Sequence, residues 1–257
     1  MSSVIANSIY NCDPPPQDHV AIIRASGTQP DALKKPSYGL DSPKGLMLSN
    51  VAAPLYLYAS LKGKGDLWDN IIDKLSPEQV AGPVLDVGCG RGLVLLKLAQ
   101  RKKTLRLTGS AYGIDIFNSA DQTGNSPTAT YANAACLSLL DHVILHTANF
   151  TLDFPFRDDV FNVITASLAL HNVSSASRES AIDEVIRVCA PGGEVIILDL
   201  MGYVSGYREI FLQHGWTDVS LELGGAKVMF GLWPCQLLKA RKPNVGPRHA
   251  TDHVSAN

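Results

Sequence analysis

The sequence predicts an α/β protein built on a Rossmann-like, doubly wound sheet whose strands are mostly parallel. Short apolar runs, typical of buried strands, alternate with segments whose apolar residues recur at helical spacing. A glycine-rich turn, VLDVGCGRG at 84–92, follows the first of these runs. Because alternating strands and helices build parallel βαβ units, a ligand is expected outside the carboxyl ends of the strands, where the strand order reverses.

The apolar runs expected to form parallel strands are 83–87, 111–116, 142–147, 160–167 and 194–200. Helices are expected at 65–75, 93–100, 182–189 and 207–214. A further helix should begin after Ser126, which can cap it, with Pro127 at its first position. The apolar face predicted for this helix consists of Ala132, Ala135, Cys136 and Leu139.

The end of the domain is predicted to differ from the repeating βα pattern. Pro191, Gly192 and Gly193 should end the preceding helix before the 194–200 strand begins. The segments TDVSLEL (217–223) and AKVMFGLW (226–233) are separated by two glycines and are predicted to form a closing antiparallel hairpin.

The length of 257 residues and the apolar content of 46% are sufficient for one domain with appendages. We expect a poorly ordered N-terminal arm over 1–36, which contains a Pro-Pro-Pro run, and a helical lid segment over 37–78. The ligand-binding domain should cover 79–242 and a tail 243–257. The longest apolar stretch, 46–61, is short and contains a proline, so we expect a lid or surface helix. A stable membrane span is not expected, and a peripheral membrane contact stays open.

Charge and cysteine content disfavour several classes of partner. The formal net charge of -2 gives no basic excess for phosphate, so nucleic acid is not expected as a partner. The five cysteines form no C-x-x-C pair, so the sequence suggests neither a disulfide framework nor a zinc site, and no metal is expected. The N-terminus has no secretory pattern, which favours a cytoplasmic protein. The oligomeric state stays open.

The glycine-rich turn departs from the dinucleotide fingerprint G-x-G-x-x-G, because its spacing is Gly88-x-Gly90-x-Gly92. Asp86 would also repel a pyrophosphate. A cationic, phosphate-free nucleoside such as S-adenosylmethionine reverses the sign of that interaction, and glycine still permits a close backbone approach. Asp115, at the end of the second strand, is placed to accept hydrogen bonds from ribose hydroxyls, a role shared by NAD and S-adenosylmethionine sites.

Four segments together resemble the successive motifs of class I S-adenosylmethionine-dependent methyltransferases, in the type 11 or ubiquinone-biosynthesis-like branch. They are VLDVGCGRG, GIDIF, TANFTLDFPFRDDVFNVITASLALHN and EVIRVCAPGGEVIILDL, which span about 80–200. The resemblance implies a seven-stranded sheet with its last strand antiparallel and S-adenosylmethionine as cofactor. It implies no particular substrate.

The resemblance also implies roles for individual residues. Residues expected to contact the cofactor are Asp86, Gly88, Cys89, Gly90, Gly92, Asp115, Ile116, Asn149, Phe150, Ser167 and Leu168. The glycines would line the methionine portion, and Asp86 would attract its ammonium group. Asn149 would contact the adenine amino group through its carbonyl oxygen, while Phe150 packs on one adenine face. Ile116 would cover the other face, a role that Phe117 could share unless it belongs to the core.

Methyl transfer needs mainly orientation and, for some acceptors, a base. His171 follows the fourth strand and is the candidate catalytic and substrate-contacting base, because histidine titrates near neutrality. Histidine at a strand end is often only a hydrogen-bonded structural residue, and this alternative stays open. Asp199 and Tyr38 are further candidates for contact with the substrate. Cys89 is expected to be a small buried side chain and not a nucleophile.

The predicted function is therefore transfer of a methyl group to a small-molecule acceptor, with a secondary metabolite as one option. The strand-4 end carries neither an Asn-Pro-Pro-aromatic tetrad nor a cysteine, which disfavours amide, adenine-amine and pyrimidine methylation. Three alternatives stay open. They are a protein that binds S-adenosylmethionine without methyl transfer (a cofactor-templated cyclase or isomerase, or a regulatory partner), a nicotinamide oxidoreductase, and a protein methyltransferase.

Overall fold

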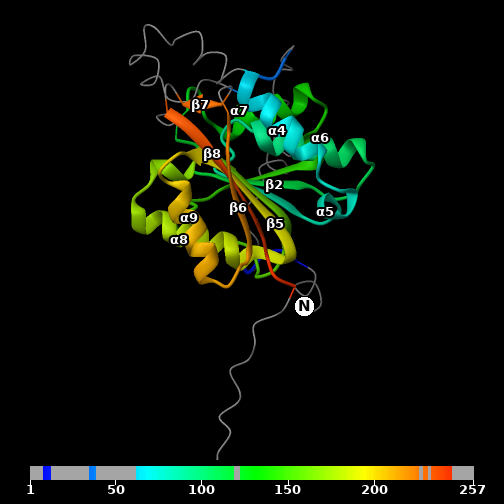
Figure 1. The fold of residues 1–257 in the computed structure, drawn as a ribbon. Coiled ribbons are helices and arrows are strands. Elements are labelled where there is room, and N and C mark those ends of the chain that lie inside the picture. Colours follow the sequence, from blue (N-terminus) through cyan, green and yellow to red (C-terminus); the bar gives the residue numbers. More distant parts are fainter. Residues whose placement is uncertain are drawn as a thin grey trace, which may run out of the picture.

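The fold was analysed in a computed structural model of the chain (Figure 1). The structure describes residues 8–12, 35–38, 62–118, 122–225, 228–230 and 233–244. Most of the predicted N-terminal arm, the apolar stretch at 46–61 and nearly all of the predicted tail lie outside the described residues. The predicted organisation of these segments stays a prediction.

One mixed sheet forms the centre of the molecule (Figure 1). Its order is β3-β2-β1-β4-β5-β8-β6, and the short β7 pairs with β8. The strand bounds are β1 Val84–Val87, β2 Ala111–Asp115, β3 Val143–Thr147, β4 Phe161–Ser167, β5 Cys189–Leu200, β6 Asp218–Leu223, β7 Met229–Phe230 and β8 Trp233–Arg241. Strands β1 to β5 pair in parallel, and β8 runs antiparallel to both β5 and β6. The predicted doubly wound sheet with an antiparallel strand near its C-terminal end is confirmed.

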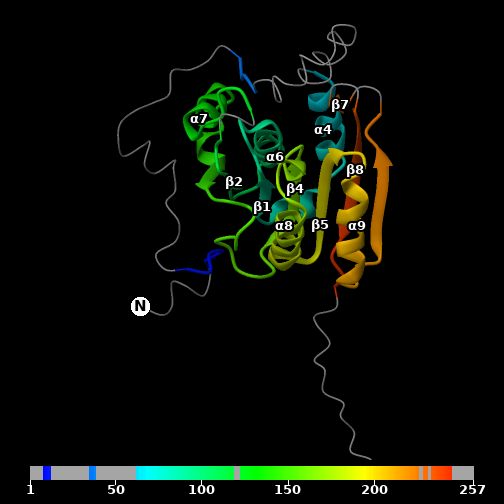
Figure 2. The same cartoon turned by 90° about the vertical axis from the view of Figure 1, so that its left-hand side faces the viewer.

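Helices cover both faces of the sheet (Figures 1 and 2). Helices α4 Lys64–Asp73, α5 Pro77–Ala81, α6 Leu93–Thr104 and α7 Pro127–Cys136 pack on one face. Helices α8 Ser175–Val188 and α9 Val204–Gln213 pack on the other. Alternate strand residues supply the two apolar layers, so that Val84 belongs to the first core and Leu85 to the second. The switch in strand order lies between β1 and β4 and opens a site at their carboxyl ends.

The partner of segment 217–223 in the closing antiparallel hairpin was predicted wrongly. Segment 226–233 contains β7 and only the first residue of β8, and β6 pairs along its length with β8. The strand β8 is inserted between β5 and β6, where Leu237 and Leu238 are both buried. A strand that is buried on both faces has no simple alternation, and this explains why its pattern was missed.

The break predicted at Pro191, Gly192 and Gly193 is also corrected. Helix α8 ends at Val188, and β5 begins at Cys189 and includes the three residues. The β4–β5 ladder shifts register between Phe161 and Val163, so the extra residues form an irregularity inside the strand.

Helix α7 begins as predicted, with Ser126 accepting a hydrogen bond from Ala129 N–H at its N-terminus. Its buried face was predicted correctly only at Leu139, which is fully buried but lies beyond the end of the helix. Ala132, Ala135 and Cys136 are only partly buried. The buried residues of the helix are Thr130, Tyr131, Asn133 and Ala134. Polar residues occupy this face because they bind the glycine-rich turn.

Two hydrogen bonds make that connection. The Thr130 hydroxyl donates to the Gly90 carbonyl at 2.7 Å, and the Asn133 amide donates to the Arg91 carbonyl at 2.9 Å. Both side chains are fully buried. A periodicity rule that counts apolar residues cannot find a helix face that serves to hold a loop.

The described part of the N-terminal arm contacts the domain. Tyr10 forms an isolated β-bridge with Phe156, and its hydroxyl lies 2.9 Å from Nε2 of His146 in β3. The backbone carbonyl of Ile9 accepts a hydrogen bond from Arg157 N–H at 2.9 Å. Residues 8–12 therefore lie against the loop that precedes β4.

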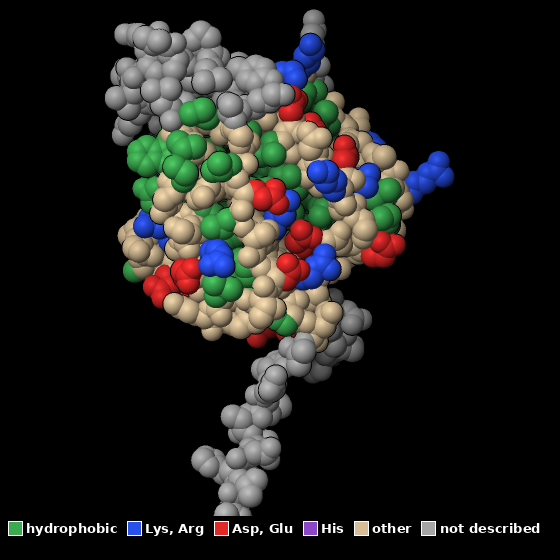
Figure 3. Space-filling view, viewed as in Figure 1, with side chains coloured by type: hydrophobic (Ala, Val, Ile, Leu, Met, Phe, Trp, Pro, Cys, Tyr) green, Lys and Arg blue, Asp and Glu red, His purple; other side chains and the backbone are tan. Residues whose placement is uncertain are grey.

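The face shown in Figure 3 carries acidic and basic side chains interspersed with one another. Lys239 of β8 pairs with Glu222 of β6 at 3.0 Å, and Arg241 lies 3.8 Å from Glu194. This face has no continuous basic stripe of the kind that binds nucleic acid. Across the described residues, no helix combines the length and apolar character needed to cross a bilayer.

Replacement of Thr130 by Val tests the attachment of the turn to α7. Val keeps the shape of the side chain and removes the hydroxyl, which leaves the Gly90 carbonyl without this donor. The free energy of unfolding should fall by about 1–3 kcal/mol, measured by chemical denaturation. Thr104→Val on the exposed end of α6 is the matched control. Equal losses in the two variants would contradict the proposed attachment.

Candidate active site

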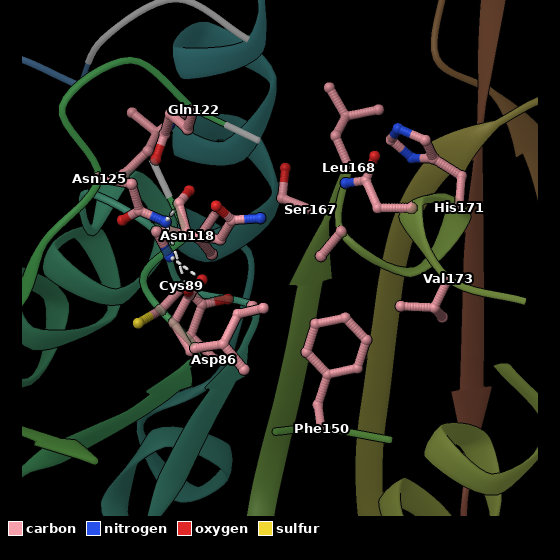
Figure 4. Close-up of a pocket in the computed structure, with 18 of the residues that line it drawn as sticks. Asp86, Cys89, Asn118, Gln122, Asn125, Phe150, Ser167, Leu168, His171 and Val173 are labelled. Carbon is pink, nitrogen blue, oxygen red and sulfur yellow. Dashed lines mark hydrogen bonds between the residues drawn. The ribbon is translucent and has the colours of Figure 1, made fainter. Parts of the chain in front are cut away.

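A pocket of about 280 Å³ lies at the carboxyl ends of β1, β2 and β4. Its lining comes from the glycine-rich turn, the segment after β2, the loop after β3 and the short helix η4 Leu170–Asn172 after β4. Figure 4 shows Asn118 and Asn125 on one wall and Leu168, His171 and Val173 on the other. This is the place where doubly wound sheets bind their ligands.

Ten of the eleven residues predicted to bind the cofactor line this one pocket. They are Asp86, Gly88, Cys89, Gly90, Asp115, Ile116, Asn149, Phe150, Ser167 and Leu168. Gly92 is not among the lining residues, and His171 is. Three separate motifs, far apart in the sequence, therefore converge on a single cavity.

The glycine-rich turn requires its glycines for two physical reasons. Gly88 and Gly90 adopt positive φ angles of 67° and 50°, in the left-handed region that glycine adopts readily. A Cβ atom at Gly88 would lie 2.4 Å from the Cβ atom of Ala169. Gly92 instead allows close packing of α6 on α7, because its Cβ atom would lie 2.9 Å from Cγ2 of Thr130. Gly92 therefore shapes the turn from behind the pocket.

Asp86 is almost fully buried and is held by two donors. The Leu95 N–H donates to Oδ2 at 3.0 Å and the Thr165 hydroxyl to Oδ1 at 2.7 Å. Because Gly92 at the N-cap of α6 has no side chain, Asp86 satisfies one of the free N–H groups at that helix end. Burial raises the pKa of Asp86 to about 7 despite these hydrogen bonds. Its charge near the pocket therefore changes close to neutral pH.

Asp115 connects β2 to the same turn. Its Oδ2 accepts a hydrogen bond from Gly90 N–H at 2.9 Å, and its Oδ1 accepts one from the Asn125 amide at 3.2 Å. The predicted ribose-binding carboxylate thus also fixes the conformation of the turn. Oδ1 also accepts a hydrogen bond from Phe117 N–H, so this carboxylate holds both the turn and the segment after β2.

The residues predicted to contact adenine differ in their exposure, packing and hydrogen bonds. Ile116 lines the pocket with a side chain that is 46% exposed, an unusual exposure for a large apolar residue. Phe117 packs against the core, which resolves the alternative between these two residues. Phe150 lines the pocket beside Gly88. The carbonyl oxygen of Asn149 already accepts hydrogen bonds from the backbone N–H and hydroxyl of Thr151.

The end of β4 links the pocket to the helix that precedes the domain. The Ser167 hydroxyl accepts a hydrogen bond at 3.0 Å from the indole of Trp68 in α4, which is fully buried. Leu168 follows with a positive φ of 53°, a strained conformation for a residue with a branched side chain. Its N–H donates to the Leu198 carbonyl at 2.8 Å, so the pairing with β5 holds the strained residue in place.

His171 lies in η4, and its ring contacts a buried acid. Its Nδ1 is 2.6 Å from Oδ1 of Asp199, and its backbone N–H donates to Oδ2 of the same residue at 3.0 Å. Asp199 is fully buried and is not among the residues that line the pocket. The structure therefore brings Asp199 to His171 and not to the cavity where a substrate contact was predicted.

Tyr38 lies away from this pocket. Its side chain borders a second hollow beside Asp69 and Leu96, between α4 and α6. Burial raises the pKa of Tyr38 to about 12, so its hydroxyl stays protonated. Its backbone carbonyl does accept a hydrogen bond from the Gln122 amide at 2.9 Å. The structure therefore places Tyr38, which was predicted to contact the substrate, outside the pocket that His171 lines.

Sequence reasoning missed several lining residues. They are Lys64, Leu93, Val94, Asn118, Gln122, Asn125, Ala169, Asn172, Val173 and Phe230. Gln122 accepts a hydrogen bond from Arg91 N–H at 3.0 Å and so supports the turn. The cluster of small polar residues between the second strand and Ser126 was a usable signal, because such residues bind exposed backbone groups.

The chemistry of the pocket fits a cationic nucleoside. The turn allows close backbone approach, Asp115 offers acceptors at a strand end, and Ile116 presents apolar surface to the cavity. Burial raises the pKa of the Cys89 thiol, which keeps it protonated and a poor nucleophile. Within the described ranges no three His, Cys, Asp or Glu side chains are grouped closely enough to hold a metal ion.

Comparison with known families agrees with this arrangement. A family described as "Methyltransferase domain" matches residues 85–197. A demethylmenaquinone methyltransferase from Symbiobacterium thermophilum is 33% identical over 117 residues, which cover 45% of this chain and 41% of that protein. A 2-phytyl-1,4-naphtoquinone methyltransferase from Trichormus variabilis is 30% identical over 138 residues, 53% of this chain and 55% of that protein. The chain spans about half the length of the curated relatives it matches.

Solved structures share the fold at low sequence identity. A geranyl diphosphate methyltransferase in complex with S-adenosylmethionine aligns with a TM-score of 0.53 and 15% identity, over 82% of this chain and 100% of that one. The cyclase SpnF aligns with a TM-score of 0.55 and 16% identity, over 81% and 100%. The fold and the family match agree, and residues 85–197 of this chain are similar to the family described as a methyltransferase domain.

Proposed function

We propose that this protein transfers a methyl group from S-adenosylmethionine to a small, mostly apolar acceptor. One observation carries the proposal: a single pocket gathers the glycine-rich turn, the strand-end acid Asp115 and the candidate base His171. When bound, S-adenosylmethionine supplies a methyl group on a positively charged sulfur. The protein must then hold the acceptor in line with that methyl group and exclude water.

The cofactor would occupy the wall formed by the turn and the segment after β2. Gly88 and Gly90 permit contact with its methionine portion, and Asp115 would accept hydrogen bonds from its ribose. Ile116 and Phe150 would enclose the adenine. Asn149 is a weaker candidate for the adenine amino group, because its carbonyl oxygen is already bonded to Thr151.

The acceptor would occupy the opposite wall. Leu168, Val173 and Phe230 line that wall around His171, which favours an apolar molecule with at least one polar group. The quinone-related substrates named for the relatives are acceptors of this kind. His171 would take a proton from the acceptor. The position that is methylated, at carbon, nitrogen or oxygen, is not part of the proposal.

Transfer itself is tested by incubating the protein with methyl-labelled S-adenosylmethionine and a cell extract. Label in a small organic product supports the proposal. Label in a macromolecular fraction would favour a protein methyltransferase instead. Binding of S-adenosylmethionine with no transfer to any fraction would favour a cofactor-binding protein without methyl transfer, and binding of NAD alone would favour an oxidoreductase.

Asp115→Ala should weaken binding of S-adenosylhomocysteine by about 1–3 kcal/mol, measured by calorimetry. The loss has two sources, because the variant removes the ribose acceptor and also releases Gly90 N–H from its partner. Glu222→Ala is the matched control, since this carboxylate lies exposed on β6 and pairs with Lys239. Unchanged affinity in Asp115→Ala would count against the assignment of the cofactor site.

Binding should also depend on pH through Asp86. Because its pKa is raised to about 7, the carboxyl is largely neutral below that pH and negative above it. Affinity for S-adenosylhomocysteine, which carries an ammonium group, should therefore rise between about pH 6 and 8, by up to about tenfold for one pKa unit of coupling. Asp86→Asn should flatten this rise.

Protein stability gives an independent measurement of the same group. In the unfolded chain Asp86 has its ordinary pKa of 3.8, so between that value and about 7 the folded state binds more protons. Its contribution to the free energy of unfolding should fall as pH rises through this window. Asp86→Asn should remove that fall, and an identical pH profile in both proteins would contradict the raised pKa.

A further inference from the structure

We infer that Asp199 is a positioning residue that holds His171 with its proton on Nδ1, so that Nε2 is left to accept a proton from the methyl acceptor. This inference rests on the proposed methyltransferase function and adds the proton path at the acceptor end. It replaces the direct contact with substrate that the sequence predicted for Asp199.

The first support is the number of donors that converge on one buried carboxylate. Oδ1 of Asp199 accepts from Leu200 N–H at 2.8 Å and lies 2.6 Å from Nδ1 of His171. Oδ2 accepts from His171 N–H at 3.0 Å and from the Tyr207 hydroxyl at 3.1 Å. Two backbone N–H groups and one tyrosine hydroxyl thus donate to this carboxyl group, and both of its oxygens serve as acceptors.

Because both oxygens of Asp199 serve as acceptors for these donors, Nδ1 is the nitrogen that carries the proton in the hydrogen bond to Oδ1. The neutral ring then has an unprotonated Nε2. No hydrogen bond joins Nε2 to another of the described residues, and the ring lines the pocket. His171 is thereby oriented at two points, through its backbone and its ring, by the same side chain.

The groups around the ring preserve this arrangement. Burial and the nearby Asp199 carboxylate raise the pKa of Tyr207 far above its usual value, so its hydroxyl remains a donor. Tyr203 of the turn before α9 lies 6.2 Å from the His171 ring, and Arg178 of α8 lies over the Tyr203 ring at 4.8 Å. From α4, Lys64 lines the same pocket. Phe230 of β7 packs against the ring at 5.6 Å and contributes no charge.

Transfer of the proton from the acceptor to Nε2 restricts the chemical class of the acceptor. An amine attacks through its own lone pair and needs no base beforehand, whereas a phenol or enol becomes a strong nucleophile once its hydroxyl loses a proton. In this step the acceptor O–H bond breaks, its proton moves to Nε2, and the released electron pair drives formation of the bond to the methyl carbon. The carbon–sulfur bond breaks with its electron pair left on sulfur. The pocket is therefore matched to an acceptor with a weakly acidic hydroxyl group.

The test compares Asp199→Asn with Asp183→Asn. Asp183 is a matched control, because it holds His214 in an exposed pair at 3.0 Å outside the pocket. Long-range proton–nitrogen NMR spectra of the full chain report which ring nitrogen of His171 carries the proton, without any acceptor. We expect the Nδ1-protonated form in the wild type and in Asp183→Asn, and a shift to the Nε2-protonated form in Asp199→Asn.

Turnover provides the second measurement, with labelled S-adenosylmethionine and the extract fraction that receives label. Asp199→Asn should lower kcat by about a hundredfold or more, the scale of a lost general base, with unchanged affinity for S-adenosylhomocysteine. Tyr207→Phe, which removes one donor of four, should lower kcat by a smaller factor and serves if Asp199→Asn does not fold.

A wild-type His171 protonated on Nε2, or a kcat in Asp199→Asn equal to that of Asp183→Asn, would overturn the inference. Either result could be obtained while the wild-type protein still transfers methyl groups. The inference about Asp199 can therefore fail without failure of the proposed function.

Discussion

Two carboxylates hold the glycine-rich turn in shape, one by accepting from an N–H group of the turn and the other by accepting from an N–H group of the helix that follows it. Asp86 reaches from β1 to the first turn of α6, and Asp115 reaches from β2 to Gly90. Thr130 closes the other side by donating to the Gly90 carbonyl. A turn built from glycine has high conformational entropy when unfolded, so these side-chain contacts fix a backbone that would otherwise be loose. The cofactor wall depends on this network before any ligand arrives.

The sequence predicted most of the fold because parallel strands leave a strong local signal. Runs such as 160–167 are mostly apolar, and the structure places strands there. The errors have a common physical cause. The buried face of α7 contains Thr130 and Asn133, whose partners are backbone carbonyls of a distant loop, and β8 pairs with β5 and β6 across long sequence separations. Neither relationship leaves a periodic pattern in the segment itself.

The candidate site could be predicted where chemistry follows a strand end. Gly88 and Leu168 come directly after buried strands and Asp115 ends one, so their positions at one edge of the sheet follow from topology. The reason given for Asp86 was incomplete. It was expected to act by charge alone, and the structure adds a second role as a substitute cap for α6. Asp199 was predicted to contact the substrate, but its orientation toward His171 depends on contacts that only the folded protein brings together.

The two walls of the pocket are therefore specified in different ways. The cofactor wall is made from backbone groups and the acids that hold them, so a substitution there disturbs the turn itself. The acceptor wall is made from side chains such as Val173 and Phe230, which take no part in holding the turn. His171 is the fixed polar point on that wall, because Asp199 holds it from the core and not from the cavity. Under the proposed assignment of the two walls, a change of acceptor would require reshaping only of the apolar residues around His171, with the cofactor wall unchanged.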